Sequence, residues 1–234
     1  MGDKVTIKGD NGETVTFGDN KWPTSELEKT FLLELVKEED VSLYWETIKK
    51  DFPEDVYEMI AKDGLDKAAS YGFITDKIKD NMSGSITREE FAEVAVKLYE
   101  RYTGKKATAG PSSAFTDTTN VEILKAYQLG IVSGIGNNQF APQVLINREQ
   151  MAAMLSRAVE VIRPNADMSI AGAPTFADEK QIAPYFTTNV QFMAKNGFIS
   201  GVGNNIFAPK ATSTREQAVI VAVRVYETYA GLTE

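Results

Sequence analysis

Residues 130–142 read GIVSGIGNNQFAP, and residues 197–209 read GFISGVGNNIFAP. An arginine follows each copy, Arg148 after the first and Arg215 after the second, so both features recur at an offset of 67 residues. The arginine segments read NREQ at 147–150 and TREQ at 214–217, and the similar TREE at 87–90 indicates a third, diverged copy. Internal repeats of this length predict an architecture of similar units packed on one another.

The composition limits the functions that the chain can perform. Its 234 residues are 43% hydrophobic and 25% charged, which is ordinary for a soluble globular protein. The net charge of −8 predicts no nucleic-acid partner. Cysteine and histidine are absent, which removes disulfides, thiolate or imidazole metal sites and histidine-assisted nucleophiles. We therefore expect no enzyme, no catalytic residue, no cofactor and no metal, with a carboxylate-based glycosidase as a distant alternative.

Two further classes of site are disfavoured. Residues 79–90 (KDNMSGSITREE) match several ligand positions of an EF-hand loop, but Lys79 stands where the first aspartate is expected. No apolar run approaches the roughly 18–20 residues that span a bilayer, so we expect no membrane insertion. The N-terminus also lacks the pattern of a signal peptide, which does not by itself make the protein cytoplasmic.

Secondary-structure signals divide the chain into an extension and a helical module. Within an extension at residues 1–22, residues 5–8 and 13–17 alternate apolar and polar side chains around Asn11-Gly12, which predicts a β-hairpin. Residues 23–234 predict a mainly α module with an additional helix at 25–37 and repeats at about 41–103, 114–163 and 175–229. Linkers rich in Gly, Pro, Ala and Ser, at 103–113 and 163–174, mark the boundaries between the repeats.

The three arginine-led segments share one apolar pattern. Counted from each arginine, the apolar positions form a stripe with helical period. They are Phe91, Val94, Ala95, Leu98, Tyr99 and Tyr102, then Met151, Met154, Leu155, Ala158, Val159 and Ile162, and then Ala218, Val221, Ala222, Val225, Tyr226 and Tyr229. Three equivalent stripes predict a central three-helix bundle with pseudo-threefold symmetry.

Short polar residues predict where helices begin and where the chain turns. Capping boxes are expected at the arginine helices, with the pairs Thr87 and Glu90, Asn147 and Gln150, and Thr214 and Gln217. Asp117 and Asp178 are expected to cap the shorter helices that precede the glycine stretches. Glycine and asparagine in those stretches favour tight turns with positive φ. The phenylalanines that follow, Phe140 and Phe207, are expected to be buried in the core beneath the turns.

Arginine at the first helical position is electrostatically unfavourable. The positive end of the helix dipole disfavours a cation there by roughly 0.3–1 kcal/mol. Three of the chain's seven arginines, Arg88, Arg148 and Arg215, nevertheless occupy this position. A bound anion would make arginine favourable at this position, because free backbone N–H groups and the guanidinium would both donate to a carboxylate or phosphate. The alternative is that each arginine pairs with a carboxylate, either Glu89, Glu149 or Glu216 beside it or one across a repeat interface.

The order of these motifs resembles the S-layer homology domain family. Phe-x-Asp, a short helix, a glycine- and asparagine-rich turn and Phe-x-Pro follow one another in residues 115–160 and 176–227. The order ends in Asn-Arg-Glu in the first of these segments and in Thr-Arg-Glu in the second. The resemblance is weaker in residues 41–103, which lack the glycine turn and Phe-x-Pro but retain Thr87-Arg88-Glu89.

The resemblance implies an extracellular module that anchors exported proteins non-covalently to the bacterial cell wall. Its implied ligand is a secondary cell-wall polysaccharide whose pyruvate ketals offer a carboxylate to the arginines, in grooves between repeats. The implied ligand-binding residues are Arg88, Arg148, Arg215, Thr87, Asn147, Thr214, Asp117, Asp178, Gly134 and Gly201. Asn147 in place of threonine and the diverged first repeat predict unequal grooves. The alternative is a structural or self-assembly domain that contacts neighbouring S-layer subunits.

Overall fold

The computed structural model describes residues 5–8, 14–17 and 54–231. Strands β1 (Val5–Lys8) and β2 (Thr14–Phe17) pair antiparallel, with Val5 opposite Phe17 and Ile7 opposite Val15. This pairing agrees with the predicted hairpin. Its turn at Asn11-Gly12 and the additional helix at 25–37 lie outside the described residues.

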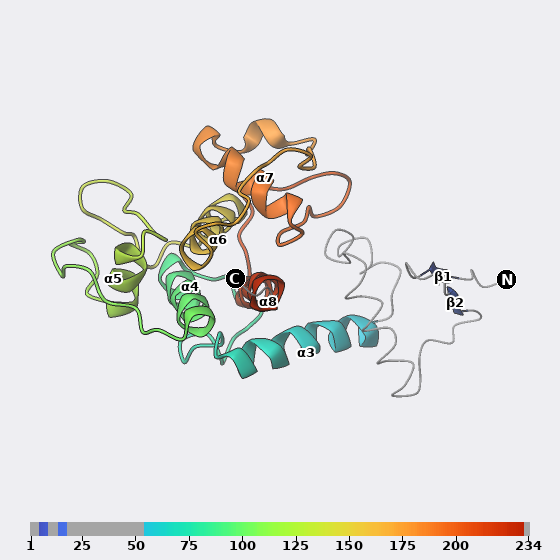
Figure 1. Ribbon diagram of the computed structural model, residues 1–234, viewed down its shortest axis with the longest axis horizontal. Helices are drawn as coiled ribbons and strands as arrows, with labels where there is room; N and C mark the ends of the chain where they lie inside the picture. The colour runs from blue at the N-terminus through green and yellow to red at the C-terminus, as the bar shows by residue number, and fades with distance from the viewer. Residues whose placement is uncertain (1–4, 9–13, 18–53, 232–234) are drawn as a thin grey trace.

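The three arginine helices lie side by side at the centre of the helical module (Figure 1). They are α4 (Arg88–Thr103), α6 (Arg148–Ile162) and α8 (Arg215–Ala230). Helix α4 packs along both α6 and α8, whereas α6 and α8 meet over a shorter length. The predicted mainly helical fold is confirmed.

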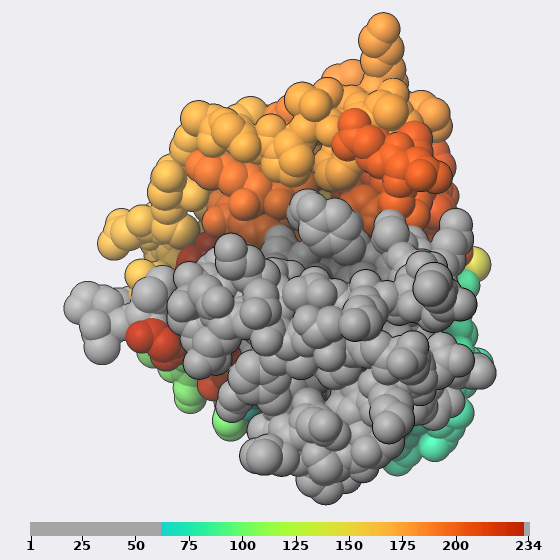
Figure 2. Space-filling view, turned by 90° about the vertical axis from the view of Figure 1, so that its right-hand side faces the viewer, coloured from blue at the N-terminus to red at the C-terminus, as the bar shows by residue number. Residues whose placement is uncertain are grey.

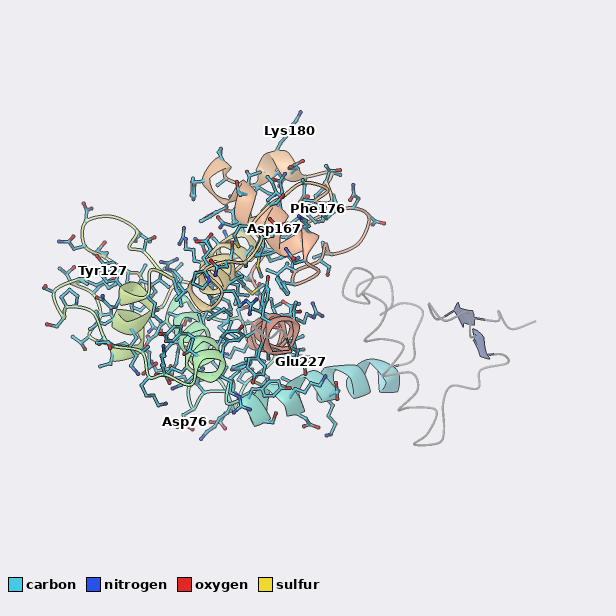
Figure 3. The ribbon with its side chains drawn as sticks, viewed as in Figure 1. Asp76, Tyr127, Asp167, Phe176, Lys180 and Glu227 are labelled. Carbon is cyan, nitrogen blue, oxygen red and sulfur yellow. The ribbon has the colours of Figure 1, made fainter. Side chains whose placement is uncertain are left out.

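The outer helices pack in a cyclic order. They are α3 (Glu54–Tyr71), α5 (Val121–Gln128) and α7 (Thr187–Lys195), the last preceded by 3₁₀ helices η2 (Glu179–Gln181) and η3 (Pro184–Phe186). Helix α5 packs on α4, α7 on α6 and α3 on α8, so each outer helix covers the arginine helix of a different repeat. Asp76, Tyr127 and Phe176 mark three separate lobes in Figure 3, and the third repeat, in orange, forms the upper part of the face in Figure 2.

The predicted apolar stripes form the core. Phe91, Leu98, Leu155 and Val225 have no exposed surface. At the edge of this core α3 is held to α8 by the Tyr71 hydroxyl, which donates to Glu227 Oε1 at 3.0 Å. Burial of three equivalent stripes in one core explains why the repeats fold as a single unit.

A closed ring of backbone hydrogen bonds joins the three repeats just before the arginine helices. The Ile86 amide donates to the Ser213 carbonyl at 2.9 Å, the Ser213 amide to the Ile146 carbonyl at 3.4 Å, and the Ile146 amide to the Ile86 carbonyl at 3.0 Å. All three residues are fully buried. The ring marks the pseudo-threefold axis that the sequence repeats predict.

The two glycine stretches fold into equivalent turns. In the first, Gly136, Asn137 and Asn138 have φ values of 108°, 50° and 53°, and Gly203, Asn204 and Asn205 match them in the second. The predicted positive φ is thus confirmed at these residues. Ala141 and Ala208 also have positive φ, 59° and 56°, which the sequence did not indicate. Phe140 and Phe207 are fully buried beneath the turns, as predicted.

Candidate functional site

The three predicted capping boxes are present. Thr87, Asn147 and Thr214 each accept from the backbone N–H three residues later, and the side chains of Glu90, Gln150 and Gln217 accept from the cap amides. The hydroxyl or amide groups of the three caps are therefore engaged in starting the helices. By starting the helices, they also position the arginines that follow.

The amides at the helix starts are not free, contrary to the sequence-based expectation. The Arg88 amide donates to the Val144 carbonyl at 2.9 Å, and the Glu89 amide donates to the Pro142 carbonyl at 3.0 Å. The equivalent amides of the other helices also reach carbonyls of another repeat: Arg148 to Ala211, Glu149 to Pro209, Arg215 to Gly84 and Glu216 to Met82. The expected anion site on free backbone N–H groups is therefore wrong, because the adjoining repeat supplies their acceptors.

The Arg88 side chain crosses from the first repeat to the turn of the second, a contact that we call the first interface. Its Nε donates to the Phe140 carbonyl at 3.0 Å and its Nη2 to the Ser133 carbonyl at 3.2 Å. The guanidinium lies 4.7 Å from the centre of the Phe140 ring, and Arg88 is only 8% exposed. Among the described residues, no carboxylate forms an ion pair with Arg88.

The Arg148 side chain repeats this arrangement at the second interface. Its Nε donates to the Phe207 carbonyl at 2.8 Å, its Nη2 donates to the Ser200 carbonyl, and the guanidinium lies 4.9 Å from the Phe207 ring centre. Arg148 is also 8% exposed. Equivalent backbone carbonyls, from the second and the third repeat, therefore orient the arginines at the two interfaces.

Arg215 differs at the third interface, where the third repeat meets the first. It forms an ion pair with Glu90, with 2.7 Å between Nη2 and Oε1. The alternative of a carboxylate partner across a repeat interface thus holds for Arg215. Two of the local carboxylates have lysine partners, because Glu89 pairs with Lys77 and Glu149 pairs with Lys210.

Asp117 and Asp178 fix the turns and do not cap helices. Asp117 accepts from the Phe140 amide at 2.9 Å and from the Ala141 amide at 2.8 Å. Asp178 accepts in the same way from Phe207 and Ala208, both at 2.8 Å. The predicted capping role is wrong, because α5 is capped by Asn120 and Asp178 makes no side-chain cap bond to η2.

Each aspartate is linked to an arginine through the backbone of one phenylalanine. Phe140 donates its amide to Asp117 and accepts at its carbonyl from Arg88. The Phe140 amide is the main cause that holds the pKa of Asp117 below its ordinary value, and the Arg88 charge acts in the same direction. Asp117 therefore positions the turn that orients Arg88.

Gly134 and Gly201 allow the turns to approach their own backbone closely. A Cβ on Gly134 would lie 2.8 Å from the Gln139 carbonyl oxygen, and one on Gly201 would lie 2.6 Å from that of Ile206. Neither glycine has positive φ. These positions need glycine for space and not for backbone conformation.

A pocket of about 300 Å³ adjoins Arg88, and residues of all three repeats line it. Arg88 comes from the first repeat, residues 132–135 and part of α6 come from the second, and η3 comes from the third. The lining residues are Arg88, Val132, Ser133, Gly134, Ile135, Gln150, Ala153, Met154, Arg157, Tyr185 and Phe186.

The pocket is electropositive. Arg88 and Arg157 are its charged lining residues, and no aspartate or glutamate is among the lining residues. Burial lowers the pKa of the Arg88 guanidinium, and the charge of Arg157 lowers it further, against the opposite effect of Asp117. The side chain of Arg157 is half-buried and makes no hydrogen bond or ion pair within the described part of the chain. Two like charges facing one cavity favour an anionic occupant.

Of the predicted site residues, the structure places Arg88 and Gly134 in this pocket. Sequence reasoning missed Arg157, although a repeat signal existed, because Arg157 and Arg224 follow Arg148 and Arg215 at the same distance. It also missed Tyr185, which is 74% exposed and lies with its ring 4.3 Å from that of Phe186. No motif in the sequence singled out Tyr185.

Two other classes of site find no support in residues 54–231. No group of three or more acidic side chains there could hold a metal ion. None of the helices in this part of the chain combines the length and apolar character of a membrane span.

Three known enzymes are similar to part of this chain. The chain is 30% identical over 184 residues to an amylopullulanase of Thermoanaerobacterium thermosulfurigenes, an alignment that covers 77% of this chain and 9% of the relative. It is 31% identical over 195 residues to exoglucanase XynX of Acetivibrio thermocellus, covering 80% of this chain and 16% of the relative. An endoglucanase of a Bacillus species is 34% identical over 140 residues, covering 58% of this chain and 14% of the relative. The chain therefore spans a small part of these relatives.

A family model gives the assignment. The model of the S-layer homology domain matches residues 114–152 and 175–219, which contain both glycine turns, Arg148 and Arg215. Residues 114–152 and 175–219, in the second and third repeats, are therefore S-layer homology domain repeats.

Proposed function

We propose that this chain is a non-covalent cell-wall anchoring module that binds a carboxylate-bearing wall polysaccharide in the pocket beside Arg88. The observation that carries the proposal is the pairing of Arg88 with Arg157 in a cavity that no carboxylate lines. A guanidinium binds a carboxylate with charge-assisted hydrogen bonds, which are about twice as strong as neutral ones. The S-layer homology domain is a cell-wall anchoring module, which agrees with this assignment.

The rest of the lining suits a sugar. Ser133 and Gln150 offer polar groups for hydroxyls, and Tyr185 offers an exposed ring face at which a pyranose can stack. A pyruvate ketal, which places a carboxylate on a sugar ring, combines both requirements in one group. We therefore propose a pyruvylated polysaccharide as the ligand.

A second copy of the site is proposed at the second interface. Arg148 is held as Arg88 is, and Arg224 stands at the position equivalent to Arg157. Gly201 and Asp178 support the turn there as Gly134 and Asp117 do in the first interface. The two interfaces share these arginines and turn residues, which supports similar ligand chemistry.

Wall pelleting tests the proposal. The chain should sediment with native bacterial walls, less with walls treated by mild acid to remove the ketals, and least with walls stripped of polysaccharide. Equal sedimentation with all three would contradict carboxylate recognition. Sedimentation with none of them, together with concentration-dependent self-association, would favour the structural or S-layer-subunit alternative.

Arg157 provides the sharpest variant, because it is half-buried and lacks a partner within the described chain. Arg157→Gln removes a charged donor worth about 1.5–3 kcal/mol, so binding to native walls should weaken by about tenfold or more. Its thermal stability should stay unchanged. Lys105→Ala removes one positive charge from an exposed linker and is the matched control. Equal binding by both variants would remove Arg157 from the site.

A further inference from the structure

The three interfaces differ in the charge of the third helical residue, which completes the capping box. Gln150, the third residue of α6, lines the pocket together with Arg88. The equivalent third residues are Gln217 in α8 and Glu90 in α4. The second and third repeats thus have a neutral amide where the first repeat has a carboxylate.

Glu90 satisfies the guanidinium of Arg215. Arg215 Nε donates to Glu90 Oε2 at 3.1 Å and Nη2 donates to Oε1 at 2.7 Å, a bidentate arrangement. The remaining nitrogen, Nη1, donates to the Asn81 carbonyl at 3.2 Å. The side chains of Arg215 and Glu90 are 15% and 12% exposed, so this fork is already occupied by an internal carboxylate shielded from water.

The diverged turn of the first repeat explains why a carboxylate is needed. At the first and second interfaces, the arginine donates to two carbonyls of a Phe-x-Pro turn. The first repeat lacks this motif, and among the described residues the Arg215 side chain donates to one backbone carbonyl, that of Asn81. Glu90 replaces the missing acceptors and neutralises a charge that would otherwise be buried unpaired.

We propose that Glu90 excludes anionic ligands from the third interface. The ion pair of Glu90 with Arg215, which joins the first repeat to the third, is called the latch below. An external carboxylate would have to displace one that is tethered beside the arginine at high effective concentration. Ligand binding is then confined to the first and second interfaces. The inference rests on the proposed function for the nature of the ligand.

Glu90→Gln tests the latch, because glutamine at this position is compatible with the capping boxes of α6 and α8. The probe is a methyl hexopyranoside carrying a pyruvate ketal, and the readout is the NMR signal of each arginine Nε–H in the ¹⁵N-labelled chain. In the native chain the probe should shift the Arg88 signal and leave that of Arg215 unchanged. In Glu90→Gln the Arg215 signal should also shift, and calorimetry should count one additional bound probe.

The outcomes separate the two claims. A shift of Arg88 in both chains with no shift of Arg215 in Glu90→Gln overturns the latch and leaves the proposed function in place. A shift of Arg215 in Glu90→Gln without any shift of Arg88 supports the latch and contradicts the proposed pocket. A shift of Arg215 in the native chain overturns the latch. An absence of any shift in both chains overturns both claims. The double variant Glu90→Gln/Arg215→Gln is the control, and its additional bound probe should disappear.

Discussion

The backbone amide of Ile86 donates to the carbonyl of Ser213 at 2.9 Å, and this bond joins the first repeat directly to the third. With the equivalent bonds through Ile146 it closes the ring on the pseudo-threefold axis. The side chains at the three positions are not equivalent, because the third repeat has serine where the other two have isoleucine. The Ser213 hydroxyl is buried and has no hydrogen-bond partner among the described residues.

Ser213→Ala should therefore stabilise the protein. A buried hydroxyl without a partner costs about 1–3 kcal/mol of desolvation, so we expect a gain of about 1 kcal/mol after the loss of packing by the oxygen. Chemical denaturation measures this gain as a higher midpoint with an unchanged slope. Ser112→Ala, at an exposed site, is the control and should change nothing. A lower midpoint for Ser213→Ala would show that the hydroxyl does have a partner.

Gly134→Ala and Gly201→Ala should destabilise the protein. The new Cβ atoms would meet the carbonyl oxygens of Gln139 and Ile206 at 2.8 and 2.6 Å, and backbone cannot move aside cheaply. Overpacking of this kind costs about 1–3 kcal/mol. Thermal unfolding measures the loss, and Gly231→Ala, where no atom lies within 4 Å of the new Cβ, is the matched control. Unchanged melting temperatures would show that the turns can relax.

Glu93→Gln should change the pH dependence of stability. Burial raises the pKa of Glu93, and the facing Glu122 and Glu89 raise it further, against Lys77 and Lys97. As pH rises from about 4.3, the unfolded chain loses this proton before the folded chain does. The free energy of unfolding therefore declines until the pH passes the folded pKa of Glu93, and the loss persists above it. Glu93→Gln should remove this decline and unfold at a higher temperature at neutral pH.

The control for this experiment is Glu160→Gln, on an exposed part of α6. It removes the same charge and should leave the pH profile parallel to that of the native chain. Melting temperatures across the acidic to neutral range provide the measurement. A profile of Glu93→Gln that runs parallel to the native one would contradict the assigned pKa shift.

Tyr185→Ala should weaken wall binding without affecting the fold. Because Tyr185 is 74% exposed, its removal leaves the core unchanged. An aromatic stacking contact contributes roughly 0.5–1.5 kcal/mol, so affinity should fall by about two- to tenfold. Tyr185→Phe keeps the ring and should bind as the native chain does. If both variants lose affinity equally, the hydroxyl and not the ring face makes the contact.

The sequence alone determined the repeats, the starts of the arginine helices and the apolar stripes. These features are local, because a capping box joins residues three apart and a stripe follows the helical period. Thr87 with Glu90 and Asn147 with Gln150 could thus be assigned from spacing. The positive φ of Asn137 and Asn138 was likewise indicated by their residue type.

Only the tertiary structure decided what the key side chains contact. Arg88 meets Phe140 and Asp117 holds the same turn because one repeat packs on the next, and nothing in the local sequence states which repeat is the neighbour. Glu90 and Gln150 are equivalent as members of a capping box. Their difference in charge matters only because Arg215 contacts Glu90 across the third interface. Hydrogen bonds and ion pairs between distant segments depend on how the whole chain packs, so residue spacing cannot specify them.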